Sequence, residues 1–391
     1  MPPDAELDPQ EDPFTAEALR RLVARYGSPL LVIDAERLRA QYRRLAAALP
    51  GVDLHFALKP LPHAAVVEVL QKEGAFFDLA SNGEVDLVRR CGIAPGRCIH
   101  THPIKRAGDI RTALAFGVST FVVDNADEVR KFAAFRTQAR LLIRVAFAGT
   151  EAVCDLSRKF GCAPDAVEEL LLLAAGLGIS VSGLSFHAGS QASGPDMHVE
   201  AIGVCAGLLR AAAARGQALC TLDIGGGFPV EYRQPAPAIE EFCAPIRTAL
   251  RGLPPAVRVI AEPGRFIAAP AAVAVASVMG RAQRGGRWWY YLDDGVYGSY
   301  SGQLFDHASY RIDALAAGAD RYPSVLAGPT CDGIDVIDED MQLPKLEIGE
   351  LIVGRSMGAY TWASASEFNF FPKATVLALD RGRLWADRRQ P

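Results

Sequence analysis

The chain has 391 residues, half of them hydrophobic, with a formal net charge of -4 at pH 7 and a pI near 6.0. This length and composition predict a globular protein of two domains and exclude a fibrous or disordered chain. The slightly acidic balance, without a basic run, argues against a nucleic-acid-binding surface.

Residues 1–13 are acidic and rich in proline, the reverse of a signal peptide, so we expect a disordered tail and a cytoplasmic protein. The longest apolar run, Ile267–Met279, is too short to span a bilayer, which predicts a buried strand and no membrane partner. The eight cysteines form no CxxC pair and no histidine stands at metal-ligand spacing. We therefore expect reduced thiols and no metal site.

From about residue 30 to residue 265, short apolar runs alternate with longer segments at helical spacing, which is the pattern of βα units. The predicted strands are Leu54–Leu58, Phe76–Ala80, Cys98–Thr101, Thr120–Val123, Leu141–Ala146, Val181–His187, Leu222–Ile224 and Val257–Ala261. The predicted helices are His63–Glu73, Glu84–Cys91, Asp127–Arg136, Ala166–Leu177 and His198–Arg215. Eight strands are the number that closes a (β/α)8 TIM barrel, although an open doubly wound sheet fits a similar alternation.

After Arg265 the pattern changes to short β-like runs between Gly, Pro and Asp clusters, such as Trp288–Leu292, Leu346–Val353 and Ala374–Leu379. These runs predict a mainly β domain, with which Leu30–Ile33 could also pair. We therefore expect a barrel over residues 36–268 and a β domain built from residues 14–35 and 269–391.

Polar residues follow the predicted barrel strands at their carboxyl ends, where TIM barrels carry their chemistry. They are Lys59, Asp78, Ser81, His187, Ser190, Gly225–Gly227, Glu262 and Arg265. Glycines let backbone N–H groups approach a phosphate, and a lysine withdrawn from water has a lowered pKa that suits a Schiff base. Glu262 could hydrogen-bond a pyridinium N–H, and His187 offers a face for stacking.

Each of these residues also has a plainer interpretation. Lys59 could be a solvated surface lysine, and His187 a core histidine bonded to backbone. The three glycines, and equally the stretch Glu262–Arg265, could be simple turns. Taken together, these plainer interpretations require that such residues stand at the ends of several predicted strands by coincidence. We therefore favour a cofactor site.

Eight blocks in order carry a resemblance over nearly the whole chain after the tail. They are Phe56–Lys59, Phe77–Ser81, Leu156–Gly161, Ser185–Gln191, Asp223–Phe228, Glu262–Arg265, Asp294–Ser299 and Gly328–Gly333. The sequence resembles the fold-type III pyridoxal-phosphate-dependent amino-acid decarboxylases, most closely the ornithine/lysine decarboxylase group. The resemblance implies an alanine racemase-like architecture of barrel plus β domain, pyridoxal 5'-phosphate as cofactor, and a homodimer with shared active sites.

The resemblance also implies roles for single residues. Lys59 would be the Schiff-base lysine, with His187 stacked on the ring and Glu262 at its nitrogen. The phosphate would be held by Ser190, Gly227, Arg265 and Tyr360, and Gly226 and Gly264 would also bind the cofactor. The polar residues that support Lys59 and the ring would be Asp78, Glu84 and Arg144.

On the substrate side, the resemblance implies that Asp306, Asp332 and Tyr297 bind an amino acid with a distal amine, such as ornithine or lysine. In the implied reaction the substrate amine displaces Lys59, the α-carboxylate leaves as carbon dioxide, and the electrons pass into the ring. Cys331 of the partner subunit then returns a proton. The expected products are carbon dioxide and an amine, as in polyamine biosynthesis.

Three departures from the family pattern leave the substrate open. Pro60 and Leu61 follow the lysine, Ala188 replaces a usual valine, and Phe370 stands where the family has glycine. A decarboxylase of a siderophore or antibiotic precursor therefore stays an alternative. Asp332 argues against a diaminopimelate decarboxylase, which has glutamate there.

Two other functional classes share this architecture. An alanine-racemase-like isomerase would place arginine, not Glu262, at the ring nitrogen. A catalytically inactive, decarboxylase-derived binding protein would be expected to lose residues such as Lys59, Asp78 and Cys331, all of which are present. The sequence therefore favours a decarboxylase.

Overall fold

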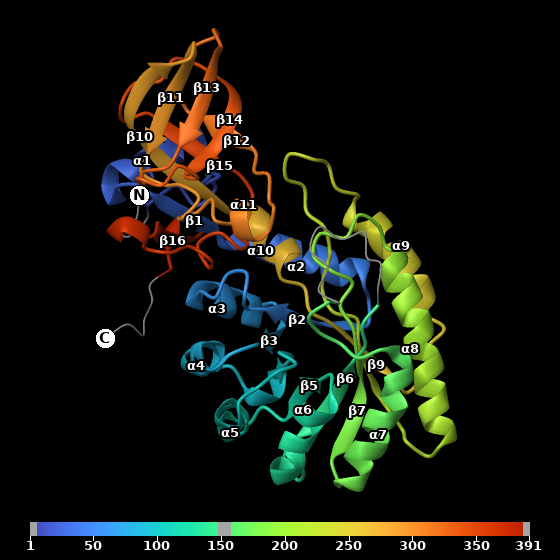
Figure 1. Cartoon of the computed structure of the whole chain (residues 1–391). Coiled ribbons are helices and arrows are strands. Elements are labelled where there is room, and N and C mark those ends of the chain that lie inside the picture. The colour runs from blue at the N-terminus through green and yellow to red at the C-terminus, as the bar shows by residue number, and fades with distance from the viewer. Residues whose placement is uncertain (1–5, 148–157, 386–391) are drawn as a thin grey trace. The chain divides into compact units, whose positions relative to one another are not determined.

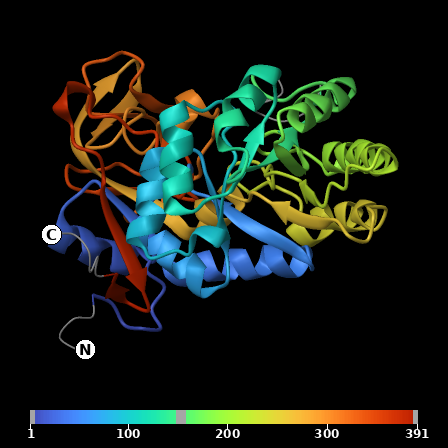
Figure 2. The ribbon, with the colours of Figure 1, turned by 90° about the horizontal axis from the view of Figure 1, so that it is seen from below.

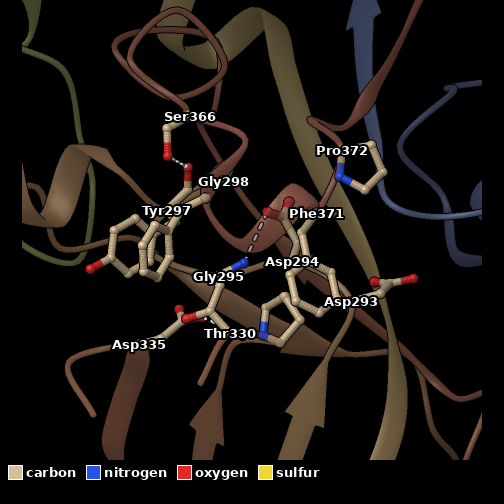
Figure 3. Close-up of a pocket in the computed structure, with 12 residues that line it drawn as sticks. Asp293, Asp294, Gly295, Tyr297, Gly298, Thr330, Asp335, Ser366, Phe371 and Pro372 are labelled. Carbon is tan, nitrogen blue, oxygen red and sulfur yellow. Dashed lines mark hydrogen bonds between the residues drawn. The ribbon is translucent and has the colours of Figure 1, made fainter. Parts of the chain in front are cut away.

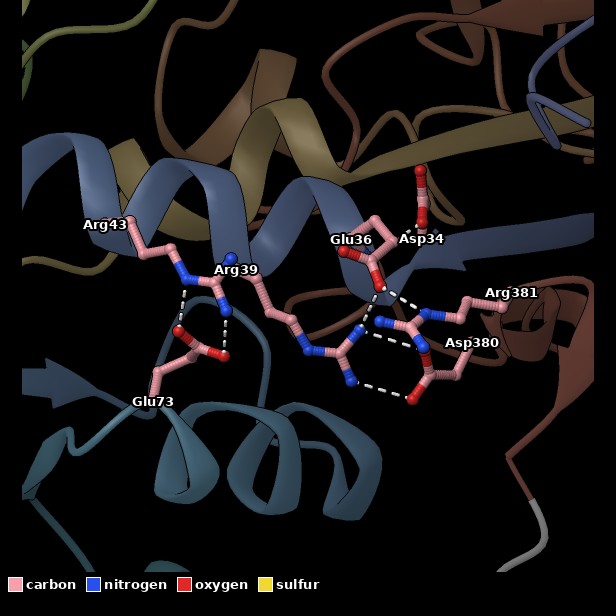
Figure 4. A network of polar contacts seen from close by, with 7 residues as sticks. All are labelled: Asp34, Glu36, Arg39, Arg43, Glu73, Asp380 and Arg381. Carbon is pink, nitrogen blue, oxygen red and sulfur yellow. Dashed lines mark hydrogen bonds and ion pairs between the residues drawn. The ribbon is translucent and has the colours of Figure 1, made fainter. Parts of the chain in front are cut away.

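The computed structural model describes residues 6–147 and 158–385, and the chain divides into two compact units. One, which we call the β unit, comprises Met1–Gln41, Val230–Pro235 and Ile267–Pro391, and the other, the barrel unit, comprises Tyr42–Pro229 and Ala236–Phe266. The predicted boundary at residue 36 falls inside a continuous helix, α2 (Ala35–Ala48). Helix α2 carries ion pairs within each unit, Arg39 with Asp380 at 2.7 Å in the β unit and Arg43 with Glu73 at 2.6 Å in the barrel unit (Figure 4).

The eight predicted barrel strands are present, and among the described residues they close into a parallel barrel in chain order, not an open sheet. They are β2 (Val52–Ala57), β3 (Phe76–Leu79), β4 (Cys98–His100), β5 (Thr120–Val123), β6 (Arg140–Arg144), β7 (Ser180–Ser185), β8 (Thr221–Asp223) and β9 (Arg258–Ala261). Pairing of β9 with β2, in the register Ala261 to Leu54, completes the closure. Ile99, Val122, Leu142 and Ile260, from β4, β5, β6 and β9, form a buried cluster, and side chains fill the interior of such a barrel.

Helices surround these strands within the barrel unit (Figures 1 and 2). They are α3 (Ala64–Lys72), α4 (Asn82–Arg90), α5 (Ala107–Phe116), α6 (Ala126–Lys131), α7 (Val167–Gly176), α8 (Asp196–Ala214) and α9 (Ile239–Leu250). By length and composition α8 is apolar enough to cross a membrane. It instead packs on β7 and α9 and buries Ile202, Cys205 and Leu209, as a barrel helix does.

The β unit is built on a sheet that has nine strands among the described residues, with the central order β14-β13-β11-β10-β1-β16-β17 and β15 and β12 branching from β10. Its strands are β1 (Leu30–Asp34), β10 (Ala272–Arg284), β11 (Arg287–Leu292), β12 (Ile312–Ala314), β13 (Tyr322–Ala327), β14 (Val336–Leu343), β15 (Leu351–Gly354), β16 (Thr375–Asp380) and β17 (Arg383–Leu384). Its helices are α1 (Ala16–Tyr26) and α11 (Gly302–Phe305). The predicted pairing of Leu30–Ile33 with this sheet is confirmed, since β1 lies between β10 and β16 (Figure 1).

Two predictions for this unit were wrong in part. The run Ile267–Met279 does not begin as a strand, because α10 (Arg265–Ala268) and a 3-10 turn containing Pro270 precede β10. The expectation of a loose tail over residues 1–13 is wrong for residues 6–13, the part of it that the structure describes. The backbone N–H groups of Glu6 and Leu7 donate to the Gly382 carbonyl, at 2.9 and 3.0 Å, and the Leu7 side chain is fully buried. Burying an apolar side chain there stabilises a segment that composition alone marks as disordered.

Candidate active site

The carboxyl end of the barrel gathers most of the predicted cofactor residues. Lys59 follows β2, Asp78 lies within β3, Arg144 ends β6, His187 follows β7 and Glu262 follows β9. They interact electrostatically: burial raises the pKa of Glu262 and lowers that of His187, and the charges of Lys59 and Arg144 act on both groups in the lowering direction. The structure therefore brings together in one unit residues that are 203 positions apart (262 minus 59).

Lys59 itself departs from expectation. Its side chain is exposed, so the predicted withdrawal of the amine from water is not seen in this structure. The unusual Pro60 that follows it is accommodated by Gly264, where a Cβ atom would stand 2.6 Å from the proline ring. The Glu262–Arg265 turn and the lysine loop therefore pack directly on each other, and the Ala57 N–H donates to the Pro263 carbonyl at 3.1 Å.

Asp78 and Glu84 lie beside Lys59. Burial, followed by the charge of Glu262, raises the pKa of Asp78 to about 8, although its carboxyl group accepts a hydrogen bond from the Thr101 hydroxyl. Burial also raises the pKa of Glu84 to about 7, while the Ala80 N–H donates to its carboxyl group. Two carboxyl groups next to the lysine are thus held partly protonated near neutral pH.

His187 is held as a neutral ring. The Gly189 N–H donates to its Nδ1 at 3.0 Å, which leaves the proton on Nε2. Burial, followed by the charges of Lys59 and Arg144, lowers its pKa well below the usual value. A neutral imidazole at this position is suited to stacking on an aromatic ring rather than to forming an ion pair.

The glycines after β8 have no room for side chains. A Cβ atom on Gly226 would stand 2.7 Å from the Glu262 carbonyl oxygen and 3.2 Å from His187 Nε2. Gly227 has φ +100°, and a Cβ there would stand 2.5 Å from the Gly189 carbonyl oxygen. This close backbone packing is the arrangement that lets N–H groups approach a phosphate.

Arg265 and Ser190 meet at the same end of the barrel. Arg265 Nη2 donates to Ser190 Oγ at 2.9 Å, and the guanidinium is buried. Of the predicted phosphate-binding residues, Ser190, Gly227 and Arg265 belong to the barrel unit, as do the cofactor-binding Gly226 and Gly264, whereas Tyr360 belongs to the β unit. A buried arginine with a hydroxyl beside it is suited to an anion of fixed geometry.

The predicted substrate residues belong to the β unit. The Tyr297 hydroxyl donates to Asp332, and the Tyr297 ring stacks on Phe368 with centroids 4.4 Å apart. The backbone N–H of the exposed Cys331 donates to Asn369 Oδ1 at 3.3 Å. Asp306, also in this unit, follows the short helix α11.

Asp335 organises this region and was not singled out by the sequence. Its two carboxylate oxygens accept from the backbone N–H groups of Val296 and Thr330, each at 2.9 Å. Because Gly295 and Gly328 lie against it, a Cβ at either position would stand within about 2.2 Å of Asp335 Oδ1. Gly295, Thr330 and Asp335 also line a pocket (Figure 3). Asp335 therefore ties the Tyr297 loop to the loop that carries Cys331 and Asp332.

Asp223 is a second residue that sequence reasoning missed, since its block was interpreted only for the glycines that follow. It is fully buried at the end of β8, and its side chain hydrogen-bonds Glu262. Of the Leu156–Gly161 block, Leu156 and Ser157 lie outside the described residues, as does Cys154 among the cysteines.

Known proteins resemble this chain over almost its full length. The family model described as "Pyridoxal-dependent decarboxylase, pyridoxal binding domain" matches residues 35–269. The lysine/ornithine decarboxylase of Selenomonas ruminantium is 33% identical over 368 residues, covering 94% of this chain and 93% of that protein.

Solved structures give the same result. The lysine/ornithine decarboxylase of Vibrio vulnificus, complexed with cadaverine, is 51% identical, covers 94% of this chain and 96% of its own, and superposes with a TM-score of 0.90. The arginine decarboxylase of Paramecium bursaria Chlorella virus is 27% identical, with coverage of 93% and 100% and a TM-score of 0.89. This chain belongs to the pyridoxal-dependent decarboxylase family.

Proposed function

We propose that this protein decarboxylates L-ornithine and L-lysine to the corresponding diamines and carbon dioxide. The observation that supports this most is the cluster of Lys59, Asp78, His187 and Glu262 at the carboxyl end of the barrel, in a chain 51% identical to a lysine/ornithine decarboxylase. Glu262 at the ring nitrogen position favours decarboxylation over racemisation, because it can keep the ring protonated.

The barrel residues fit pyridoxal phosphate. Glu262 Oε1 is buried and has no hydrogen-bond donor among the described residues, as a partner for a protonated ring nitrogen would be. A Cβ atom on Gly226 or Gly227 would clash with the carbonyl oxygen of Glu262 or of Gly189, so only glycine fits at these two positions. We propose that Lys59 binds the cofactor covalently, that His187 stacks on its ring, and that Arg265, Ser190, Gly227 and Gly264 hold its phosphate.

When bound, the cofactor supplies an electron sink for the bond that breaks as carbon dioxide leaves. The chain's own residues then have separate tasks. Glu262 keeps a proton at the ring nitrogen, and neutral His187 covers the ring without adding charge. Because Asp78 and Glu84 are partly protonated, neither holds the neighbouring Lys59 in a strong ion pair. Arg144 supplies a cation that interacts with Asp78, Asp223 and Glu262.

For the substrate, we propose that Asp332 and Asp306 bind the distal ammonium by charge-assisted hydrogen bonds and that Tyr297 orients Asp332. The hydrogen bond from Tyr297 lowers the pKa of Asp332, which keeps its carboxylate charged. The Cys331 thiol would return the proton to the carbon that has lost carbon dioxide.

We propose further that two copies form a homodimer in which the Cys331 loop of one copy serves the barrel of the other. The exposure of this loop supports the proposal, because Cys331 is flanked by the exposed apolar side chains Ile334, Phe368 and Phe370. Such a patch beside functional residues is typical of an interaction surface. The free thiols of the seven described cysteines are compatible with the cytoplasmic location that we also propose.

A substrate panel tests the proposed function. The purified protein with pyridoxal phosphate is given L-ornithine, L-lysine, L-arginine and a larger conjugate with an amino-acid head, and carbon dioxide and amine are measured. We expect release from ornithine and lysine, and little from arginine. Release from the conjugate alone would keep the decarboxylase class and reject the substrate, in favour of a specialised precursor.

A further inference from the structure

Two buried carboxyl groups face each other at the carboxyl ends of neighbouring strands. β8 and β9 pair in parallel with Asp223 beside Ile260, and the Glu262 N–H donates to the Gly225 carbonyl at 2.8 Å. Asp223 is 0% exposed and Glu262 is 9% exposed, and their side chains hydrogen-bond each other. The backbone therefore fixes the two groups in contact.

The two carboxyl groups have fewer hydrogen-bond donors around them than they have oxygen atoms to accept. Asp223 Oδ1 accepts from the Gly225 N–H at 2.9 Å, whereas Asp223 Oδ2 and Glu262 Oε1 have no N–H or hydroxyl donor among the described residues. A contact between two carboxyl groups needs a proton, because two carboxylates offer only acceptors and repel. The geometry thus requires that one group of the pair be protonated.

The surrounding charges do not remove this proton. The groups that interact with the pair from other elements are Asp78, which is acidic, and the cations Lys59 and Arg144. Burial, the largest effect, outweighs the cations and raises the pKa of Asp223 to about 7 and that of Glu262 well above its usual value. Burial therefore favours a pair that keeps a proton.

We propose that Asp223 and Glu262 hold one proton between them, and that Asp223 is the positioning residue that keeps this proton on Glu262 until the cofactor's ring nitrogen takes it. The O–H bond of Glu262 breaks, an N–H bond forms at the ring nitrogen, and Glu262 becomes a carboxylate beside the ring cation. No proton is drawn from solvent in this step. The second half of this inference rests on the proposed function, whereas the shared proton does not.

The shared proton is tested on the cofactor-free protein, apart from any activity. The pH dependence of the free energy of unfolding is compared between the wild type and the double variant Asp223→Asn with Glu262→Gln. We expect the two slopes to differ by one proton above about pH 7, where Asp223 is ionised and the folded pair keeps a single proton that the unfolded chain releases. A difference of two protons, or of none, would overturn the proposal. Buried carboxyl groups that do not interact with the pair contribute equally to both proteins and cancel.

The transfer is tested by calorimetry of pyridoxal phosphate binding to the wild type and to Asp223→Asn alone, in two buffers with different heats of ionisation. We expect Asp223→Asn to take up more protons from solvent than the wild type, up to one per chain, because burial alone then keeps the proton on its Glu262. Asp34→Asn, which changes a buried carboxyl group of the β unit, should keep the wild-type proton count. If Asp223→Asn only weakened binding and left the count unchanged, its role would be structural. This experiment needs cofactor binding but no turnover, so it stands even if no amino acid in the panel reacts.

Discussion

The Tyr297 hydroxyl donates a hydrogen bond to the Asp332 carboxylate, although the two residues come from different loops of the β unit. Phe368 stacks on the Tyr297 ring from one side, and Asp335 holds both loops through backbone hydrogen bonds. The Asp332 carboxylate is therefore fixed before any substrate arrives, which is the condition for recognising a distal ammonium at low entropic cost.

Tyr297→Phe tests this arrangement, because it keeps the stacking and removes the hydrogen bond. We expect KM for the diamino acid to rise by about tenfold, the size of one hydrogen bond to a charged group, with a smaller change in kcat. Steady-state kinetics measure both. Tyr291→Phe on β11 is the matched control and should leave KM unchanged. An equal fall in kcat with constant KM would show that Tyr297 does not act through substrate binding.

Asp78→Asn should change how stability depends on pH. Burial raises the pKa of Asp78 to about 8, so between about pH 5 and pH 8 the folded chain holds a proton that the unfolded chain releases. The cofactor-free protein therefore loses stability as the pH rises through this window, and Asp78→Asn should remove about 1.4 kcal/mol per pH unit of that slope. Urea unfolding at several pH values measures it. Parallel curves for the two proteins would contradict the raised pKa.

Arg265→Gln should weaken binding of the cofactor's phosphate specifically. Removing one charged hydrogen-bond donor predicts an affinity for pyridoxal phosphate about tenfold to a hundredfold lower, with little change for pyridoxal, which lacks the phosphate. Absorbance titrations with both compounds measure this difference. Arg258→Gln, at the opposite end of β9 and paired with Asp53 on the surface, is the control. Equal losses for both compounds would place Arg265 outside the phosphate site.

Phe370→Gly tests the proposed dimer contact. Phe370 has φ +61°, a backbone conformation that favours glycine, and its ring is 98% exposed. Within one chain the substitution relieves strain of about 1 kcal/mol, yet we expect it to weaken association of two copies, because the ring would lose its contact with the second copy.

Sedimentation over a range of concentrations measures this association. Tyr322→Ser, which removes an exposed aromatic side chain from β13, should leave it unchanged. If Phe370→Gly associated as tightly as the wild type, the ring would have no part in the interface.

The sequence predicted the barrel well because apolar strand runs and their polar carboxyl ends recur in register. The helices α5 and α9 were not predicted, and α9 carries an internal proline, Pro245. The exposure of Lys59 depends on how loops pack, and no local pattern reports it. Asp223 and Asp335 were missed for a similar reason, since a carboxyl group's partners come from segments distant in sequence. Asp335 bonds Val296, and Asp223 bonds Glu262, across such separations.

Release of carbon dioxide from carboxyl-labelled L-ornithine and L-lysine by the wild type and by Lys59→Ala, both supplied with pyridoxal phosphate, tests the central claim most directly. We expect steady release of carbon dioxide by the wild type. In Lys59→Ala the rate should fall by at least a thousandfold, on the order of the effect of removing a covalent catalyst. Lys72→Ala on helix α3 should keep the wild-type rate. Undiminished turnover in Lys59→Ala would contradict the assignment of the active site to the carboxyl end of this barrel.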